Sequence, residues 1–315
     1  PQPRSLGIDD KWQNIGGMEN RGVEAILSAD LVRSNDFSWL LDFNITSYKN
    51  EITELPQEEI IDGSKKLMVG KSVYEFFIRD YAGADAETGA ALYWKDEVEL
   101  DGDGNPVLDE NGDPVKTGNK LVTEDPTDAD RYYQGTSIPD FYGGITNTFR
   151  FKGFDLSVFL TYSVGGKFLD YNYIWLMREG DVGMGWHEDI LDNWTEPIPT
   201  DGLPTATNTD GNDVTYDPDL VPRVEIGNTD LRYTSNRFLF DATYFNVRNI
   251  TLGYTLPANL ASRIGAGSAR IYVTGDNLFI YTKNPGMDPR QDFAGTAQTQ
   301  YSPVKTYTVG LNIKF

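Results

Sequence analysis

The residues between positions 96 and 113 suggest metal chemistry more directly than any other part of the sequence. This run holds eight carboxylates and no basic residue. It starts like an EF-hand calcium loop with Asp101-Gly-Asp-Gly-Asn105, but Pro106 stands where that loop needs glycine and Gly112 where it needs a bidentate glutamate. Two successive turns, Asp-Gly-Asn-Pro and Asn-Gly-Asp-Pro, each before a valine, explain the run as solvated hairpin tips. Calcium in these loops stays an unsupported alternative, and no cofactor is predicted.

The sequence offers few residues of the types that carry out catalysis. There is one histidine, His187, and there is no cysteine, which excludes thiolate metal sites and disulfides. No nucleophile motif or phosphate-binding loop stands near His187, so a surface-loop histidine and a protein that is not an enzyme are expected. The formal net charge of −21 argues against nucleic acid as a partner, because phosphate contacts need lysine and arginine.

Aromatic side chains in the long connections are the candidate ligand-binding residues. Rings of this kind can stack on a sugar or a peptide while polar neighbours fix its orientation. The alternative is that the rings pack the loops against one another. The candidates are Trp94, Tyr132, Tyr133, Trp175 and Trp186. The acidic loops disfavour a strongly anionic ligand through repulsion, although a local basic pocket can reverse that preference.

The last ten residues, Thr306–Phe315, indicate the kind of element that positions these groups. Apolar and polar side chains alternate without a break, and a strand turns alternate side chains to opposite faces. About ten such residues, tilted, can cross a bilayer in a barrel. We expect this strand to serve also as the assembly signal of the barrel, through its apolar row of Tyr307, Val309, Leu311, Ile313 and Phe315.

Nine segments show a strand pattern of this kind, some more weakly than others, and a β-bulge near Arg248-Asn249 would keep one of them in phase. The connections between them alternate strictly between short and long, as in transmembrane barrels with short periplasmic turns and long extracellular loops. The sequence therefore predicts an all-β fold, a partial antiparallel transmembrane barrel. The nine segments are Gly22–Val32, Phe37–Tyr48, Val73–Tyr81, Ala90–Val98, Phe141–Phe151, Phe154–Ser163, Phe240–Leu256, Ala269–Thr282 and Thr306–Phe315.

The odd number of strands has a consequence for the domain organisation. A barrel with both ends in the periplasm needs an even number, so at least one strand is expected upstream and residues 22–32 should have an unpaired edge. A closed barrel of eight strands stays possible if one weak strand is false. The longest connection, 164–239, is expected to be an extracellular loop with a short helical segment inside residues 168–194.

Several blocks of the sequence resemble one family, the SusC/RagA group of TonB-dependent outer-membrane transporters. The strongest resemblance lies at Ser235–Pro257, followed by Arg270–Phe279, by Gly286-Met-Asp-Pro289 and by the terminal strand. Weaker blocks are Asn14–Glu24, Val73–Gly89, Pro139–Phe149 and Lys152–Val158. Together these blocks cover residues 14 to 315, in the order and spacing of the C-terminal part of such a transporter.

The resemblance implies that residues 1–315 are about nine strands of a 22-stranded barrel whose plug domain lies outside this sequence. It implies uptake of oligosaccharides or peptides across the outer membrane of a Bacteroidota-type cell. The implied partners are a SusD-like surface lipoprotein, the TonB–ExbB–ExbD complex acting on the missing part, outer-membrane lipids and the barrel assembly machinery.

Two alternatives stay open. One is another TonB-dependent receptor or a porin-like barrel for metal chelates. The other is a soluble all-β protein that binds or hydrolyses glycans. The soluble alternative requires that the apolar strand rows, such as Trp39, Leu41 and Phe43, lie buried in a dry core.

Overall fold

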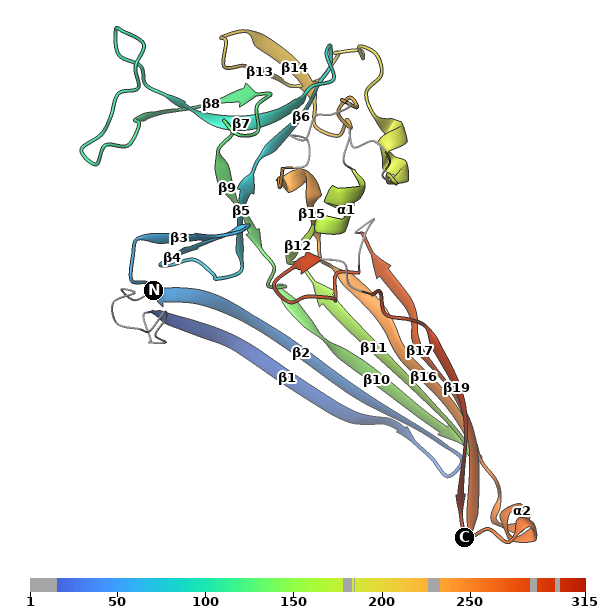
Figure 1. Cartoon of the computed structure of the whole chain (residues 1–315). Coiled ribbons are helices and arrows are strands. Elements are labelled where there is room, and N and C mark those ends of the chain that lie inside the picture. Colours follow the sequence, from blue (N-terminus) through green and yellow to red (C-terminus); the bar gives the residue numbers. More distant parts are fainter. Residues whose placement is uncertain (1–15, 178–182, 184, 226–232, 284–287, 298–300) are drawn as a thin grey trace, which may run out of the picture.

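A wall of long antiparallel strands dominates the computed structural model, which describes all residues except 1–15, 178–182, 184, 226–232, 284–287 and 298–300. Within the described residues the wall has seven strands, and every neighbouring pair is antiparallel (Figure 1). In their order across the sheet they are β1 (Gly17–Arg33), β2 (Phe37–Glu54), β10 (Phe141–Phe151), β11 (Phe154–Val164), β16 (Tyr244–Thr255), β17 (Ser268–Thr282) and β19 (Thr306–Lys314).

The two faces of the wall differ because directly paired residues share a face. One row joins hydroxyl side chains across five strands: Thr148, Ser157, Thr251, Thr274 and Thr308. The neighbouring row joins apolar side chains across six: Trp39, Phe149, Leu156, Leu252, Val273 and Val309. We call the two sides the polar face and the apolar face.

The apolar face stays exposed. Val273 on β17, next to the edge strand, is 49% exposed, and Val309 on the edge strand β19 is 72% exposed. The rows that a soluble protein would bury, such as Trp39, Leu41 and Phe43, are only partly covered. A contiguous apolar surface of this extent marks contact with a membrane or another protein. The dry core that the soluble alternative requires is therefore not found under these rows.

Two local predictions about the wall are confirmed. The β10–β11 hairpin turns on Lys152 and Gly153, which have φ values of 46° and 89°, as the two-residue turn of a twisted hairpin demands. The bulge lies at Arg248, which is skipped in the register with β11 between Val247 and Asn249. In the register with β17, Arg248 stands opposite two skipped residues, Asn277 and Leu278. The extra residue keeps Val247 and Ile250 on the same apolar face.

The prediction of nine wall strands is wrong, because two of the nine segments belong elsewhere. The segment 73–81 forms β5 (Glu75–Arg79), and the segment 90–98 forms β7 (Ala91–Val98). β5 is too short to cross a bilayer. β7 begins with three consecutive buried residues, so it is covered on both faces as in a globular core. Seven is still odd, and within the described residues β1 and β19 each pair with one neighbour only.

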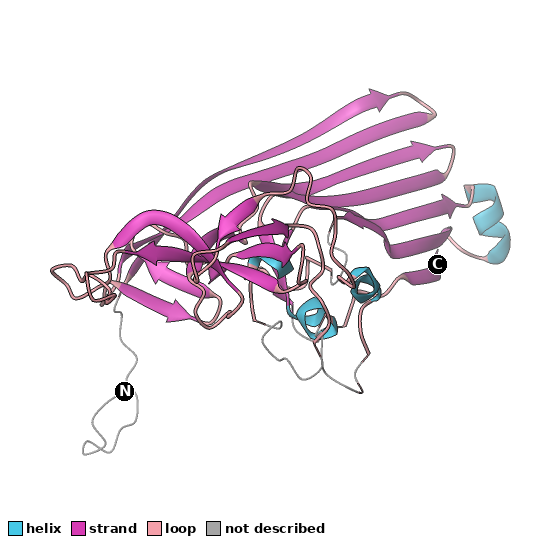
Figure 2. Ribbon diagram, turned by 90° about the horizontal axis from the view of Figure 1, so that it is seen from above, coloured by secondary structure: helices cyan, strands magenta, loops and turns pink. Residues whose placement is uncertain are grey.

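The alternation of short and long connections holds for these seven strands. Residues 34–36, 152–153 and 256–267 connect strands at one end of the wall, which we call the turn end (Figure 1). The long connections 55–140, 165–243 and 283–305 all leave from the other end, the loop end. Their described residues form a separate structure, the loop region, which Figure 2 shows beside the wall from above.

The loop region contains three small sheets among its described residues. The first has the order β13 (Thr205–Thr207), β14 (Asp213–Asp217), β6 (Tyr81–Asp85), β7 and β8 (Lys116–Thr123). The second has the order β3 (Glu59–Asp62), β4 (Lys65–Met68), β5 and β9 (Arg131–Thr136). The third has the order β15 (Leu239–Asp241), β12 (Lys167–Asp170) and β18 (Thr296–Ala297).

Helices are few and short. α1 (Tyr171–Leu176) lies in the 164–239 connection, parts of which fall outside the described residues, and α2 (Ala258–Ala261) lies at the turn end. Short 3-10 turns cover Glu188–Asp192, Asn236–Phe238 and Ser262–Ile264. Among the described residues, no helix has the length and apolar character that a membrane span requires.

The buried hydrophobic clusters of the chain lie in the loop region. The largest joins β5, α1 and the turn before β15, and its buried members are Phe76, Ile78, Leu169, Tyr173, Ile174, Met177, Ile190 and Phe238. A second cluster joins β6, β7, β8 and β14 through Ala82, Leu92, Val122 and Tyr216. The loop region therefore has its own cores, which the wall does not share.

Candidate functional site

The polar face of the wall holds the candidate site, and glycines make room for its side chains at the turn end. Arg270 on β17 reaches across β16 to Asp155 on β11, with its Nε donating to Asp155 Oδ1 at 2.9 Å and its Nη2 to Oδ2. Gly253 lies between them, where a Cβ would stand 2.2 Å from the Arg270 Nη2. The pair therefore braces three strands.

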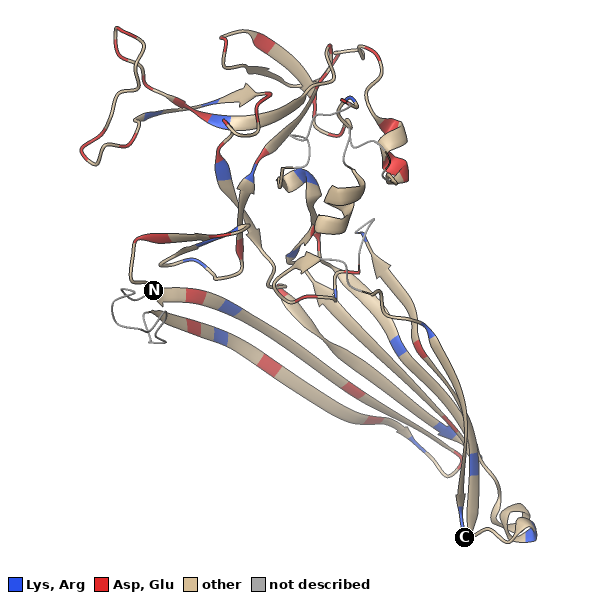
Figure 3. Ribbon diagram, viewed as in Figure 1, with Lys and Arg blue, Asp and Glu red and all other residues tan. Residues whose placement is uncertain are grey.

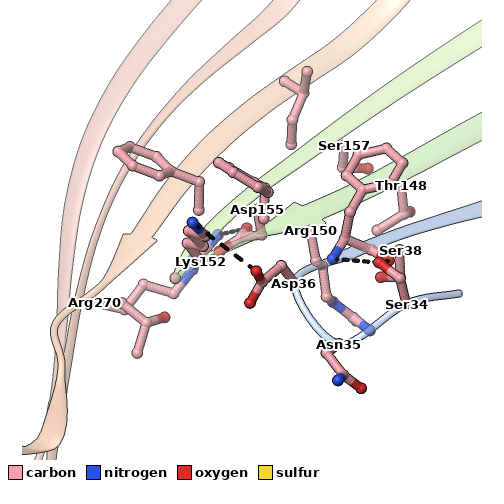
Figure 4. Close-up of a pocket in the computed structure, with 16 residues that line it drawn as sticks. Ser34, Asn35, Asp36, Ser38, Thr148, Arg150, Lys152, Asp155, Ser157 and Arg270 are labelled. Carbon is pink, nitrogen blue, oxygen red and sulfur yellow. Dashed lines mark hydrogen bonds and ion pairs between the residues drawn. The ribbon is translucent and has the colours of Figure 1, made fainter.

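A cavity of about 590 Å³ opens beside this brace. Figure 4 shows Lys152 reaching toward Asp36, with an Nζ–Oδ2 distance of 3.9 Å, and Arg150 beside the turn before β2. Serine and threonine hydroxyls from β2, β10 and β11 also line the cavity, together with apolar residues such as Phe151 and Phe154. The arrangement offers hydrogen bonds and some positive charge to a polar surface.

At the loop end a described part of the last long connection crosses the polar face. We call residues 288–297 the mouth strap. Phe293 of this strap stacks on Tyr48 of β2, with ring centroids 6.4 Å apart, and meets Tyr74 edge-on at 5.2 Å. Arg290 of the strap lines a cavity with Tyr244 of β16, so the strap reaches from β16 across β11 and β10 to β2.

Hydrogen bonds anchor the mouth strap to the loop region. Leu169 donates its backbone N–H to Gly295 O at 2.7 Å, and the Ser137 hydroxyl donates to Phe293 O at 3.0 Å. Gly295 has a φ of 75°, and a Cβ there would stand 2.4 Å from Ser137. Only glycine fits this close approach without strain.

Two cavities lie between the strap, the wall and the loop region. One, of about 380 Å³, is lined mainly by polar-face residues of β2, β10, β11 and β16. The other, of about 260 Å³, extends toward β12 and Phe293. Both are lined by Tyr142, Tyr244 and Arg290. We call the pair of cavities the vestibule.

The predicted aromatic residues do not form one site. Trp94 on β7 meets Tyr216 edge-on at 6.0 Å, and Tyr132 on β9 lies under the Lys120 ammonium at 3.8 Å. Lys120 also lies 6.0 Å from the Trp94 ring, so the structure brings Trp94 and Tyr132 together around one lysine. Burial, followed by the hydrogen bond to Asp96, raises the pKa of the Tyr132 phenol, which therefore stays protonated.

The other three aromatic candidates lie apart. Tyr133 points to the opposite face of β9 from Tyr132 and packs against Phe77, with ring centroids 5.2 Å apart. Trp175 in α1 is 51% exposed and Trp186 is 40% exposed. Both belong to the 165–243 connection, and neither lines the vestibule cavities.

The acidic run has the turn structure expected of hairpin tips. The Asp101 carboxylate accepts the backbone N–H groups of Asp103 and Asn105, both at 2.9 Å. Asp109 does the same eight residues later. Figure 3 shows these acidic loops projecting from the loop region. Within the described part of the chain, no three acidic or histidine side chains converge as a metal site.

His187 is partly buried, in contrast to the surface position expected for it. Its Nδ1 accepts the Asp189 N–H at 3.2 Å, and its ring meets Tyr173 edge-on at 5.0 Å. This histidine therefore begins the 3-10 turn at Glu188–Asp192 and packs against the main cluster of the loop region.

Sequence reasoning missed the vestibule residues. Three of them lie near the loop end of predicted strands: Tyr142, Tyr244 and Asn246. The alternation of side chains along those strands could have assigned all three to the polar face. Arg290 comes from a connection about 40 residues further along the chain, and no local pattern places it over β16.

Comparison with known proteins gives one consistent result. TonB-dependent receptor P3 of Formosa agariphila is 29% identical over the whole chain, which spans 30% of that receptor. The TonB-dependent receptor SusC of Bacteroides thetaiotaomicron is 27% identical over 96% of the chain, which corresponds to 27% of SusC. The chain thus spans about three tenths of the length of the curated relatives it matches. No family model matches it.

Solved structures agree in fold. The RagAB peptide transporter superposes on the whole chain with a TM-score of 0.73 at 23% identity, over 31% of the matched chain. Its open-open state gives a TM-score of 0.71. The chain is therefore homologous along its whole length to a portion of TonB-dependent receptors, SusC among them, and its fold is a partial antiparallel transmembrane β-barrel with large loops.

Proposed function

We propose that this chain is part of a TonB-dependent importer of the outer membrane of a Bacteroidota-type cell. The observation that carries the proposal is the wall itself, with hydroxyl rows on one face and exposed apolar rows on the other, in a chain that resembles such receptors throughout. The apolar face would contact lipid, and the polar face would line a water-filled path.

Sidedness follows from the connections. Barrels of the outer membrane have short periplasmic turns and long outer loops, so the turn end would lie in the periplasm and the loop region outside the cell. The vestibule would then be the first polar-face site that an entering ligand meets. The loop-region aromatics Trp94 and Tyr132 would be secondary contacts around Lys120.

The ligand class we propose is oligosaccharides or peptides, and import would need partners. A SusD-like lipoprotein would cover the loop region, and the TonB–ExbB–ExbD complex would supply energy through parts of the receptor outside this chain. The terminal row from Tyr307 to Phe315 would present the barrel to the assembly machinery, because its side chains lie on the exposed apolar face.

Energy-dependent uptake by the full-length receptor in its own cells tests this proposal. Cells lacking the receptor should lose growth on one class of oligosaccharide or peptide, and cells with the receptor but without TonB should lose it equally. The receptor, purified in detergent, should carry a lipoprotein with it. A receptor that supports uptake of metal chelates only, with no lipoprotein bound, would contradict the proposed ligand and partner.

A further inference from the structure

Two residues that line the larger vestibule cavity, Asn246 and Arg290, each have a buried polar atom without a hydrogen-bond partner among the described residues. Asn246 on β16 is 1% exposed, and its Oδ1 is unpaired, while its Nδ2 makes one long bond to Thr161 Oγ1 at 3.3 Å. The Nη1 of Arg290 on the mouth strap is also buried and unpaired. A buried polar group without a partner costs about 1–3 kcal/mol, so such groups need an explanation.

The charges around this cavity are mainly positive. The guanidinium groups of Arg248 and Arg290 line it, and no carboxylate does. Asp288 pairs with Arg290 through Nε and Nη2, which leaves Nη1 as the free donor. Asp288 balances the charge of Arg290, and Asp292 lines the neighbouring cavity, so the positive excess at this site comes from Arg248, which is exposed and donates through Nη1 to Asn277 Oδ1. The chain as a whole has a net charge of −21, opposite in sign to this site.

Every polar side chain that lines the cavity can donate a hydrogen bond. The Tyr142 and Tyr244 phenols and the Thr161 hydroxyl can donate, and both guanidiniums can only donate. Asn246 presents either its oxygen or its nitrogen, since the amide can turn about its last bond and Thr161 can bond either atom. Arginine, with its planar set of N–H groups, is the side chain best suited to a carboxylate.

We propose that this cavity is a carboxylate subsite, in which the guanidinium groups of Arg290 and Arg248 hold the negative group and Asn246 and Tyr244 orient it. The subsite rests on the proposed import function and names the chemistry of the ligand: an acidic group carried by a sugar, such as a uronate, or by a peptide, such as its C-terminus. The acidic loop region would then repel weakly bound anions, while the vestibule retains those that reach it.

Acetate and acetamide form a matched pair for the test, because they share shape and differ in charge. The thermal midpoint of the full-length receptor in detergent is measured with each at equal concentration and equal ionic strength. We expect acetate to raise the midpoint by about 2 °C more than acetamide does. The double variant Arg248→Gln/Arg290→Gln should lose this difference, while Arg263→Gln, an exposed arginine at the turn end, should keep it.

Larger probes distinguish the source of the carboxylate. An oligosaccharide ending in glucuronate is compared with the same chain ending in glucose, and a peptide with a free C-terminus is compared with its amide. The acidic member of one pair should bind at least tenfold more tightly to the wild-type receptor and lose that gain in the double variant.

Equal effects of acetate and acetamide, or an acetate effect that survives in the double variant, would overturn the subsite. Tighter binding of the neutral probes would overturn it as well. The import proposal fails separately, through absent energy-dependent uptake, so the two failures can be told apart.

Discussion

The loop region buries its apolar side chains in cores, whereas the wall leaves many of its apolar side chains exposed. In the loop region, β5 buries Phe76 and Ile78 in a cluster closed by α1 and the turn before β15. In the wall, strands of similar apolar content leave Val273 and Val309 exposed. The difference teaches that the same alternating pattern can build a core or a membrane-facing surface, and that strand length and the neighbouring elements decide which one forms.

The largest expected effect tests whether the loop region is a folding unit of its own. Phe76→Ala in the full-length receptor removes a ring that is completely buried, which should cost about 3–5 kcal/mol. Hydrogen exchange should show faster exchange in β5, β9 and α1 while β10, β11 and β16 keep their protection. Equal loss of protection in the wall would show that the two regions unfold together.

The next prediction tests the assignment of the two faces. Val158→Arg places a charge on the apolar face in the middle of β11 and should cost about 2–4 kcal/mol, whereas Ser157→Arg, on the polar face, should cost little. For each variant, urea unfolding in lipid vesicles measures the stability of the receptor. The amount of receptor in outer-membrane fractions measures its assembly. The faces are assigned wrongly if Ser157→Arg is the more damaging change.

A pH-dependent prediction concerns the loop region alone. Lys65 on β4 lies over the Phe76 ring, with its Nζ 3.1 Å from the centroid, and burial lowers its pKa to about 7. The folded protein therefore loses this proton at lower pH than the unfolded chain, so stability should rise above pH 7 as the cost of a buried charge disappears.

The expected gain is about 2 kcal/mol between pH 7 and pH 9. Chemical unfolding of the loop region, followed at both pH values, should show this gain in the wild type and lose it in Lys65→Met. If Lys65→Met gains as much stability between pH 7 and pH 9 as the wild type does, the pH dependence comes from other groups.

The smallest effect concerns the brace in the wall. Arg270→Met removes the pair with Asp155, which is partly exposed to solvent, and should cost about 1 kcal/mol or less. The matched change Arg263→Met, at an exposed position, should have no effect on urea unfolding in the same vesicles. A larger loss for Arg270→Met would mean that cross-strand pairs, and not lipid contact, hold this end of the wall.

Much of the wall could be predicted from the sequence because its strands and turns follow from patterns within short segments. Ten alternating residues define β19, and Lys152-Gly153 defines the β10–β11 turn without reference to any other segment. The phase change in β16 likewise located the bulge at Arg248. These features depend on neighbours in sequence, so pattern reasoning was sufficient.

The loop region and the vestibule depend on contacts between distant segments, which local patterns do not contain. β5 and β7 carry the strand pattern, but their burial is set by α1, β8 and β14. Trp94 and Tyr132 meet only because β7, β8 and β9 place them around Lys120. Arg290 lines the same cavity as Asn246 because of the path of the mouth strap, which cannot be read from residues 288–297 alone.

The bulge at Arg248 also bears on how such a strand can change length. Arg248 is an extra residue in the register against β11, so its deletion would leave Asn246 and Asn249 on the polar face and Val247 and Ile250 on the apolar face. A deletion at Thr251 would instead turn half of the strand inside out. Insertions and deletions of single residues among homologous chains should therefore gather at this position and be rare in the regular parts of β16.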